Sequence, residues 1–208
     1  MHNSARNVFV NCPFDREYLP LLRPLVFTIL DLGFRPRLSL ERSDSGEPRI
    51  EKIISLIQQS KFGIHDLSRC HARKRGELFR LNMPLELGLD LGCKRFSRGL
   101  RRKKKCLILE TESYRYQATV SDLSNSDIFA HGDDPEELIR GVRNWLVQEA
   151  HAHPKSGSAI WGAFLDFMAE NFNRLVREGY SKREIELFPI NELKDSMRRW
   201  TVKRRRKF

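Results

Sequence analysis

The chain has no apolar run close to the roughly 18 residues that a membrane-spanning helix requires. The apolar stretch near its start is too short for a secretory signal, so we expect a cytoplasmic protein with no membrane partner. Glycine (12) and proline (9) are too few for a collagen-like chain, and 40% hydrophobic residues argue against a disordered one. The 208 residues fit one domain of ordinary size with an extension.

Cysteine is scarce and scattered. The four cysteines form no CxxC pair and have no short regular spacing: Cys12, Cys70, Cys93 and Cys106. This pattern argues against a disulfide framework and does not look like a zinc site. His151 and His153 lack a third ligand at a metal-site spacing. We therefore predict no bound metal.

The positive charge is concentrated in two places. Lysine and arginine number 38 against 27 acidic residues, a net charge of +11. Two clusters account for all of this excess: Arg98, Arg101, Arg102, Lys103, Lys104 and Lys105, and then Lys203, Arg204, Arg205, Arg206 and Lys207. Such runs favour a nucleic acid or an acidic protein as partner. The alternative is a solvated loop and a frayed tail.

Strands and helices alternate along the first three quarters of the chain. We predict strands at 8–11, 34–40, 62–66, 106–109 and 128–129, the fourth of them a continuous apolar run typical of a strand buried on both faces. Helices are predicted to about residue 32, around 50–57, over 82–91 with Gly92 ending the helix, and from 135 to about 152. We expect Asn82 to cap the third of these helices.

This alternation predicts an α/β, flavodoxin-like three-layer fold with a five-stranded parallel sheet in the order 2-1-3-4-5. Ligands in such sheets bind beyond the carboxyl ends of the strands at the topological switch point, here between the first and third strands. We take 1–153 as this domain and 154–208 as a helical C-terminal extension with a basic tail. Helices are expected at 159–176, 182–187 and 191–200.

The extension is rich in large apolar side chains, among them Trp161, Phe164, Leu165, Phe167 and Met168. They form more apolar area than one helix face needs. One interpretation is a homo-oligomer formed through residues 155–200. The other is that these helices cover the edge of the sheet.

The loops at the predicted ligand edge carry polar candidates for substrate binding. They are Asn11, Asp15, Asp44, Ser45, Arg49 and Asn82, with Phe14 beside them and Asp66 at the end of the third strand. Each has an ordinary alternative. Asp15, Asp44 and Ser45 are common cap or turn residues, Arg49 suits a solvated first turn, and aspartate often follows a strand.

Glu86 is harder to explain structurally. It lies in the first turn of a leucine-dense helix, where the helix dipole stabilises a carboxylate by roughly 0.3–1 kcal/mol. Asp90 lies one turn further on the same face, which disfavours ionisation of both groups. A carboxylate at the start of a helix on the ligand edge is also well placed for chemistry. We therefore favour a functional role for Glu86.

The segment from the third strand to the fourth resembles the nucleoside 2-deoxyribosyltransferases. It comprises Phe62-Gly-Ile-His-Asp66, a long loop, Asn82-Met-Pro-Leu-Glu86-Leu-Gly-Leu-Asp-Leu-Gly92-Cys-Lys-Arg and Cys106-Leu-Ile-Leu109. The chain is also similar to the related Toll/interleukin-1 receptor (TIR) superfamily, whose enzymes cleave NAD with a glutamate. The resemblance covers about residues 8–145. The chain departs from the transferases in Pro84 and Leu85, inserted before Glu86, in a basic loop between Asp66 and Asn82, and in the extra C-terminal helices.

This resemblance implies an N-glycosidase that cleaves the base–ribose bond of a nucleotide, NAD or a deoxynucleotide, and needs no cofactor. Glu86 would attack or stabilise the sugar C1′, and Asp66 would hold the ribose or help the base to leave. Asn11 and Asp15 would bind the sugar or the base, and the Ser45–Arg49 turn would hold a phosphate. The resemblance extends to bacterial antiviral-defence effectors, including those partnered with retrons.

The rival hypothesis is a non-catalytic module. In it the same site senses a nucleotide while the two basic clusters, 98–105 and 203–207, dock nucleic acid or an acidic protein.

Overall fold

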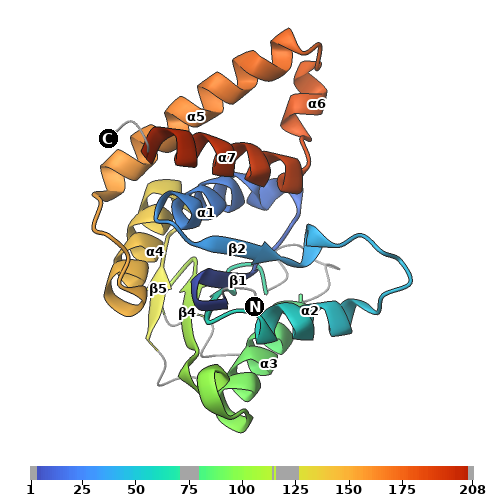
Figure 1. Ribbon diagram of the computed structural model, residues 1–208, viewed down its shortest axis with the longest axis vertical. Coiled ribbons are helices and arrows are strands. Elements are labelled where there is room, and N and C mark those ends of the chain that lie inside the picture. Colours follow the sequence, from blue (N-terminus) through green and yellow to red (C-terminus); the bar gives the residue numbers. More distant parts are fainter. Residues whose placement is uncertain (1–3, 71–79, 114, 116–126, 206–208) are drawn as a thin grey trace.

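The computed structural model describes residues 4–70, 80–113, 115 and 127–205 (Figure 1). The five strands are β1 (Asn7–Asn11), β2 (Arg35–Leu38), β3 (Phe62–Asp66), β4 (Lys105–Glu110) and β5 (Ile128–Ala130). The α-helices are α1 (Leu19–Asp31), α2 (Arg49–Gln58), α3 (Asn82–Phe96), α4 (Pro135–Ala150), α5 (Gly157–Arg177), α6 (Lys182–Glu186) and α7 (Ile190–Arg205). Four 3-10 turns join them: η1 (Ser4–Arg6), η2 (Arg16–Tyr18), η3 (Ser39–Glu41) and η4 (Gly99–Lys103).

The strands form one parallel sheet in the order β2-β1-β3-β4-β5. The predicted flavodoxin-like α/β fold and its strand order are therefore confirmed. Val8 of β1 is paired with Pro36 of β2 on one side and with Phe62 of β3 on the other. This register places the carboxyl ends of β1 and β3 side by side at the switch point of the sheet.

The helices make layers on both faces of the sheet (Figure 1). On one face lie α2 and α3, where Ile53, Leu56 and Ile57 pack with Phe9 of β1. Ile53, Leu56 and Ile57 are thus the contact of α2 with the sheet, whereas Ile50 at the start of the helix is exposed. On the other face lie α1 and α4, and α5 and α7 cover these two helices from outside.

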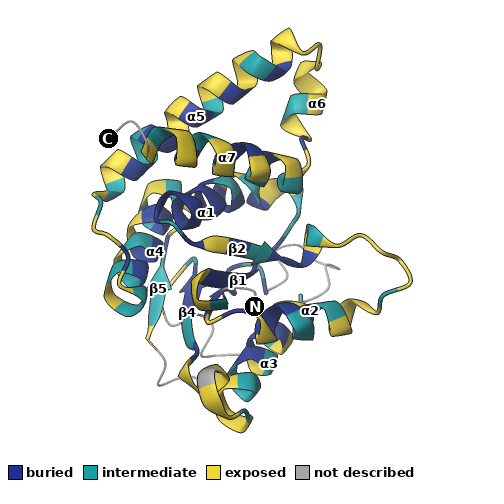
Figure 2. Cartoon of the chain, in the orientation of Figure 1, coloured by how far each residue is buried: buried dark blue, intermediate teal, exposed yellow. Residues whose placement is uncertain are grey.

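Helix α1 is buried along almost its whole length, because the sheet covers one side and the C-terminal helices cover the other (Figure 2). The ring of Phe27 on α1 lies 5.5 Å from that of Phe164 and 5.8 Å from those of Phe167 and Trp200 (centroid distances). The extension therefore shares the main hydrophobic core of the α/β unit.

This packing uses most of the apolar side chains that had raised the possibility of an oligomer. Phe164 and Phe167 are buried, Trp161 and Met168 pack against the core, and Leu165 is exposed. The helices cover α1 and α4, not the edge of the sheet. None of the described helices is both long enough and apolar enough to cross a membrane.

Two predicted helix boundaries were wrong. Helix α3 continues to Phe96, so Gly92 lies inside the helix instead of ending it, and no side chain caps its start. Asn82 is therefore the first helical residue and not a cap. Helix α7 continues to Arg205, so the basic tail is helical at least that far.

Candidate functional site at the carboxyl edge of the sheet

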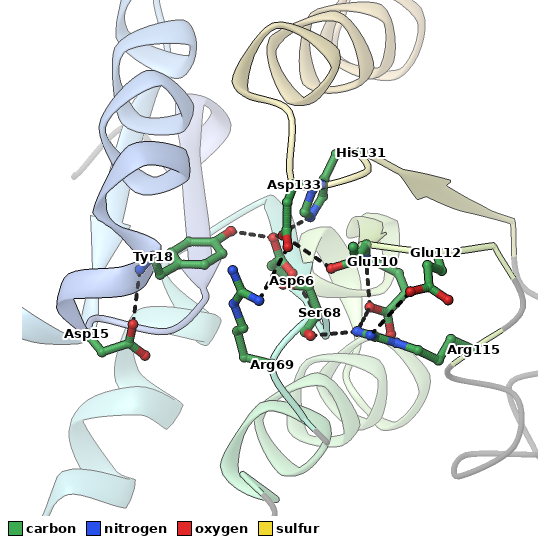
Figure 3. A network of polar contacts seen from close by, with 11 residues as sticks. Asp15, Tyr18, Asp66, Ser68, Arg69, Glu110, Glu112, Arg115, His131 and Asp133 are labelled. Atoms are coloured by element: carbon green, nitrogen blue, oxygen red, sulfur yellow. Dashed lines mark hydrogen bonds and ion pairs between the residues drawn. The ribbon is translucent and has the colours of Figure 1, made fainter. Parts of the chain in front are cut away.

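Asp66 ends β3 and is fully buried within a set of hydrogen bonds (Figure 3). Its carboxylate accepts bonds from the Tyr18 hydroxyl, from His131 Nε2 at 3.1 Å and from the backbone N–H of Ser68 at 2.8 Å. Burial by itself would raise the pKa of Asp66, but the bonds from His131, Ser68 and Tyr18 lower it below its ordinary value. Asp66 is therefore a fixed, ionised carboxylate.

Neither Tyr18 nor His131 was identified from the sequence. Tyr18 ends η2, whose first turn is capped by Asp15, since the Asp15 carboxylate accepts the Tyr18 N–H at 3.0 Å. His131 follows β5 directly, and its Nδ1 accepts the N–H of Asp133 at 3.1 Å. Its Nε2 must therefore carry the proton that is donated to Asp66. The position of His131 directly after a strand was the one signal that could have indicated it.

Two arginines belong to the same network: Arg69 lies near Asp66, and Arg115 lies beside Ser68 and Glu110 (Figure 3). Arg69 Nη1 is 3.4 Å from the carboxylate of Asp133, longer than a good hydrogen bond. Arg115 donates at 2.6 Å to both the backbone carbonyl of Ser68 and the carboxylate of Glu110.

Several buried polar atoms of this group have no hydrogen-bond partner in the described part of the chain. They are Ser68 Oγ, Arg69 Nε and Nη1, Glu110 Oε2 and Arg115 Nε. A buried group left unpaired costs about 1–3 kcal/mol, so such groups are few in folded proteins and mark sites where another partner binds.

Glu86 is the fifth residue of α3, so it lies just beyond the first turn in which the sequence had placed it, and it is only 4% exposed. Its carboxylate makes no hydrogen bond or ion pair with any residue that the structure describes. Burial raises the pKa of Glu86 from 4.5 to about 7, and the positive charge of Arg49 only partly opposes this. A buried carboxylate without a partner is unusual outside functional sites.

A chain of buried polar groups fixes the start of α3 against β1. Asn11 Nδ2 donates to the Met83 carbonyl at 2.8 Å and is 3.1 Å from His65 Nδ1. Because the carbonyl can only accept, the Asn11 amide must present its NH₂ group there, and its Oδ1 is left buried and unpaired. His65 then donates through Nε2 to Asp90 at 3.0 Å. These bonds fix the Met83 carbonyl at the start of α3, and Glu86 follows three residues later on the same helix.

Lys104, in the first basic cluster, is buried and not solvated as the alternative of a solvated loop had expected. Its side chain is 1% exposed, and its Nζ donates to the Ile57 carbonyl at 2.8 Å and lies 3.1 Å from Asp90. His65, Asp90 and Cys106 present metal-ligand atoms within 4.8 Å of one another. The ammonium group already supplies positive charge to Asp90, which argues against a cation at this cluster. Lys105 also has a partner, Glu149, at 2.7 Å.

The structure brings three of the predicted site residues, Asn11, Asp66 and Glu86, together at the end of β1, with Asp15 close to them. Burial raises the pKa of the Cys12 thiol, and the charges of Asp66, Glu86 and Asp15 add to the effect. These carboxylates therefore surround the end of β1. Asn11 lies at the same strand end.

The other predicted residues have local roles or face solvent. Asp15 caps η2 and pairs with Arg80, and Asp44 accepts the Gly46 N–H at 2.9 Å. The cap and turn interpretations are confirmed for these two aspartates. Exposed or half-buried positions are occupied by Phe14, Ser45, Arg49 and Asn82. Because Asp44 uses the Gly46 N–H, the turn before α2 offers one donor fewer to a phosphate.

Comparisons with protein-family models, with curated proteins and with solved structures found no match for this chain. What the site does is therefore argued from its own residues.

Proposed function

We propose that the chain is an N-glycosidase that cleaves the bond between base and ribose in a nucleotide, NAD or a deoxynucleotide. The observation that carries this proposal is the burial of Glu86, near the start of α3, with no hydrogen-bond or ion-pair partner among the described residues. It lies beside the carboxyl ends of β1 and β3. In a parallel α/β sheet this is the place where ligands bind.

The chemistry of N-glycoside cleavage explains why such a carboxylate is useful. As the C1′–N bond breaks, its electron pair leaves with the base and positive charge develops on C1′ and the ring oxygen. A carboxylate that no donor neutralises stabilises this charge strongly, because the surrounding protein screens it less than water does. Glu86 holds C1′ by charge or by a transient ester bond. Water then supplies hydroxide to C1′ and a proton to the base.

The raised pKa of Glu86 fits this role. At pH 7 the free enzyme holds Glu86 about half protonated, since its pKa is about 7. The charge that develops on the sugar favours the ionised form of Glu86, so the interaction is stronger in the transition state than in the free enzyme.

We assign to Asp66 a role that differs from the one expected from the sequence. The sequence assigned Asp66 to the ribose or to the leaving base, but its carboxylate is 0% exposed and is bonded to Tyr18, His131 and Ser68. We assign to Asp66 the role of holding Tyr18, His131 and Ser68 in position. Asn11 Oδ1, which lacks a partner, is the acceptor that we assign to a sugar hydroxyl.

The test is release of free base from NAD, deoxynucleotides and deoxynucleosides, followed by chromatography. We expect the natural chain to release base from one of the nucleotides, and Glu86→Gln to be slower by about 100-fold or more, as for loss of one main electrostatic contact. The matched control is Glu192→Gln, the same change at an exposed first-turn glutamate of α7. It should leave the rate unchanged.

The fold of each variant is checked by its circular dichroism and its unfolding transition. A folded Glu86→Gln chain that releases base at the natural rate would refute the assignment of Glu86. Tight nucleotide binding by the natural chain with no base released would instead support the non-catalytic sensing hypothesis.

A further inference from the structure

The two outermost helices, α5 and α7, diverge toward α6 (Figure 1). Side chains of both helices line a groove. The groove has a volume of about 550 Å³. Its polar lining residues are Glu170, Asn171, Asn173, Arg174, Arg177, Ser196, Arg199 and Lys203, with Phe167 and Trp200 at its apolar part. This groove takes no part in the proposed glycosidase site.

Four cations and one acid line this groove. The acid, Glu170, accepts the Trp200 indole N–H at 2.8 Å, and Arg174 pairs with Glu178 at 2.7 Å. The other three cations have no carboxylate partner among the described residues: Arg177, Arg199 and Lys203. All three are exposed. The groove therefore carries positive charge that the protein does not neutralise.

The charge comes from both walls and continues beyond the groove. Arg177 lies on α5, while Arg199 and Lys203 lie one turn apart on α7. Further along α7 follow Arg204, whose guanidinium lies 5.3 Å from the Trp200 ring centre, and Arg205. A row of cations matches a ligand with repeated negative charges better than it matches a single anion.

We propose that the groove between α5 and α7 binds the phosphate backbone of a single-stranded nucleic acid. Arginine binds phosphate oxygens with two parallel N–H donors, and two of the three unpaired cations are arginines. A cavity of this size between two helices admits one strand but not a duplex. Single-strand binding proteins likewise follow the phosphate backbone with a positively charged groove.

This proposal differs from the docking hypothesis drawn from the sequence, which used the clusters 98–105 and 203–207. Lys104 is buried and Lys105 is paired, so the first cluster offers less free charge than its composition indicates. Of the described residues of the second cluster, Lys203 to Arg205, only Lys203 lines the groove, and Arg206 and Lys207 lie outside the described residues. The other unpaired cations, Arg177 and Arg199, lie outside both clusters.

The test uses the full chain and a fluorescent single-stranded DNA of mixed sequence, with anisotropy measured over a range of salt. Each phosphate contact contributes a slope of about −0.7 to log K against log [salt] for a single strand, so three contacts give about −2. Affinity should then fall about 20-fold for a fourfold rise in salt. Arg177→Gln, Arg199→Gln and Lys203→Gln should each weaken binding and flatten the slope by about 0.7.

Two control variants keep the test specific. Arg183→Gln on α6 and Arg98→Gln in the basic loop remove exposed charges that do not line the groove, and both should bind as the natural chain does. Equal losses in the controls and the groove variants would overturn the proposal, as would no binding at low salt. A duplex of the same sequence that binds as tightly as the strand would overturn it too, as would a polyglutamate that competes as well as unlabelled DNA.

Discussion

The unpaired state of Glu86 has a consequence for stability that can be measured without a substrate. In the unfolded chain its carboxyl titrates with a pKa near 4.5, and in the folded protein with a pKa of about 7. Between these two values the folded state holds a proton that the unfolded state has lost. The contribution of Glu86 to stability must therefore fall as the pH rises from 4.5 to 7 and stay level above that.

The magnitude follows from the size of the change. Each pKa unit corresponds to about 1.4 kcal/mol, so the shift from 4.5 to about 7 corresponds to about 3 kcal/mol lost between these pH values. Glutamine has the same shape and does not titrate. We expect Glu86→Gln to match the natural chain within about 0.5 kcal/mol at pH 4.5 and to be more stable by about 3 kcal/mol at pH 8.

The assay is urea unfolding of both chains at the two pH values, with the free energy taken by linear extrapolation. Glu41→Gln is a control for which the change in the free energy of unfolding at pH 8 is expected to have the opposite sign. Burial raises the pKa of Glu41, but its bonds to Lys194 and Arg37 lower it below its usual value, so Glu41 stabilises the fold at neutral pH and this stability is lost in acid. Glu41→Gln should therefore be less stable than the natural chain at pH 8. If Glu86→Gln were less stable than the natural chain at pH 8, Glu86 would have a partner and the reasoning would fail.

Two further predictions concern the buried polar chain beneath the site. A Cβ at Gly63 would lie 2.2 Å from Asp90 Oδ2, so Gly63→Ala should destabilise the protein by roughly 3 kcal/mol, while Gly88→Ala, which meets nothing within 4 Å on an exposed face of α3, should stabilise it by up to about 1 kcal/mol. Thermal unfolding of the pair compares them, and equal effects would contradict the packing at Gly63. Lys104→Met leaves Asp90 buried without its ammonium partner and should cost about 3–5 kcal/mol, whereas Lys104→Met combined with Asp90→Leu should cost clearly less than the sum of the single changes. Additive losses in that double-mutant cycle would show that the two groups do not interact.

Much of the fold is readable in the sequence because it depends on local patterns. The residues of β3 are those predicted, and Ile53 and Ile57 of α2, one turn apart, face the sheet. The end of α1 near residue 32 was also predicted, and the glycine that follows, Gly33, takes a φ of +86° that other residues rarely adopt and so ends the helix. At Gly92 the same rule failed, because α3 passes through that glycine without a change of backbone conformation.

The site was predicted in part for the same reason. Asn11 and Asp66 end strands and Glu86 begins a helix, so the order of the elements alone brings them to one edge of the sheet. Their partners were not predictable in this way. Tyr18 and His131 lie 48 and 65 residues from Asp66, and no local pattern marks a contact over such a separation.

The amino-acid sequence alone determined the alternation of strands and helices, because this depends on the spacing of apolar side chains along the chain. The alternation in turn indicated the order of the parallel sheet and the edge at which the carboxylates gather. Only the tertiary structure decided which charges are free. It buried Lys104 against Asp90, enclosed Asp66 among three donors and left Glu86 without a donor among the residues that the structure describes. Charge and hydrogen bonding depend on which groups meet in space, and that is set by packing between elements that are far apart along the chain.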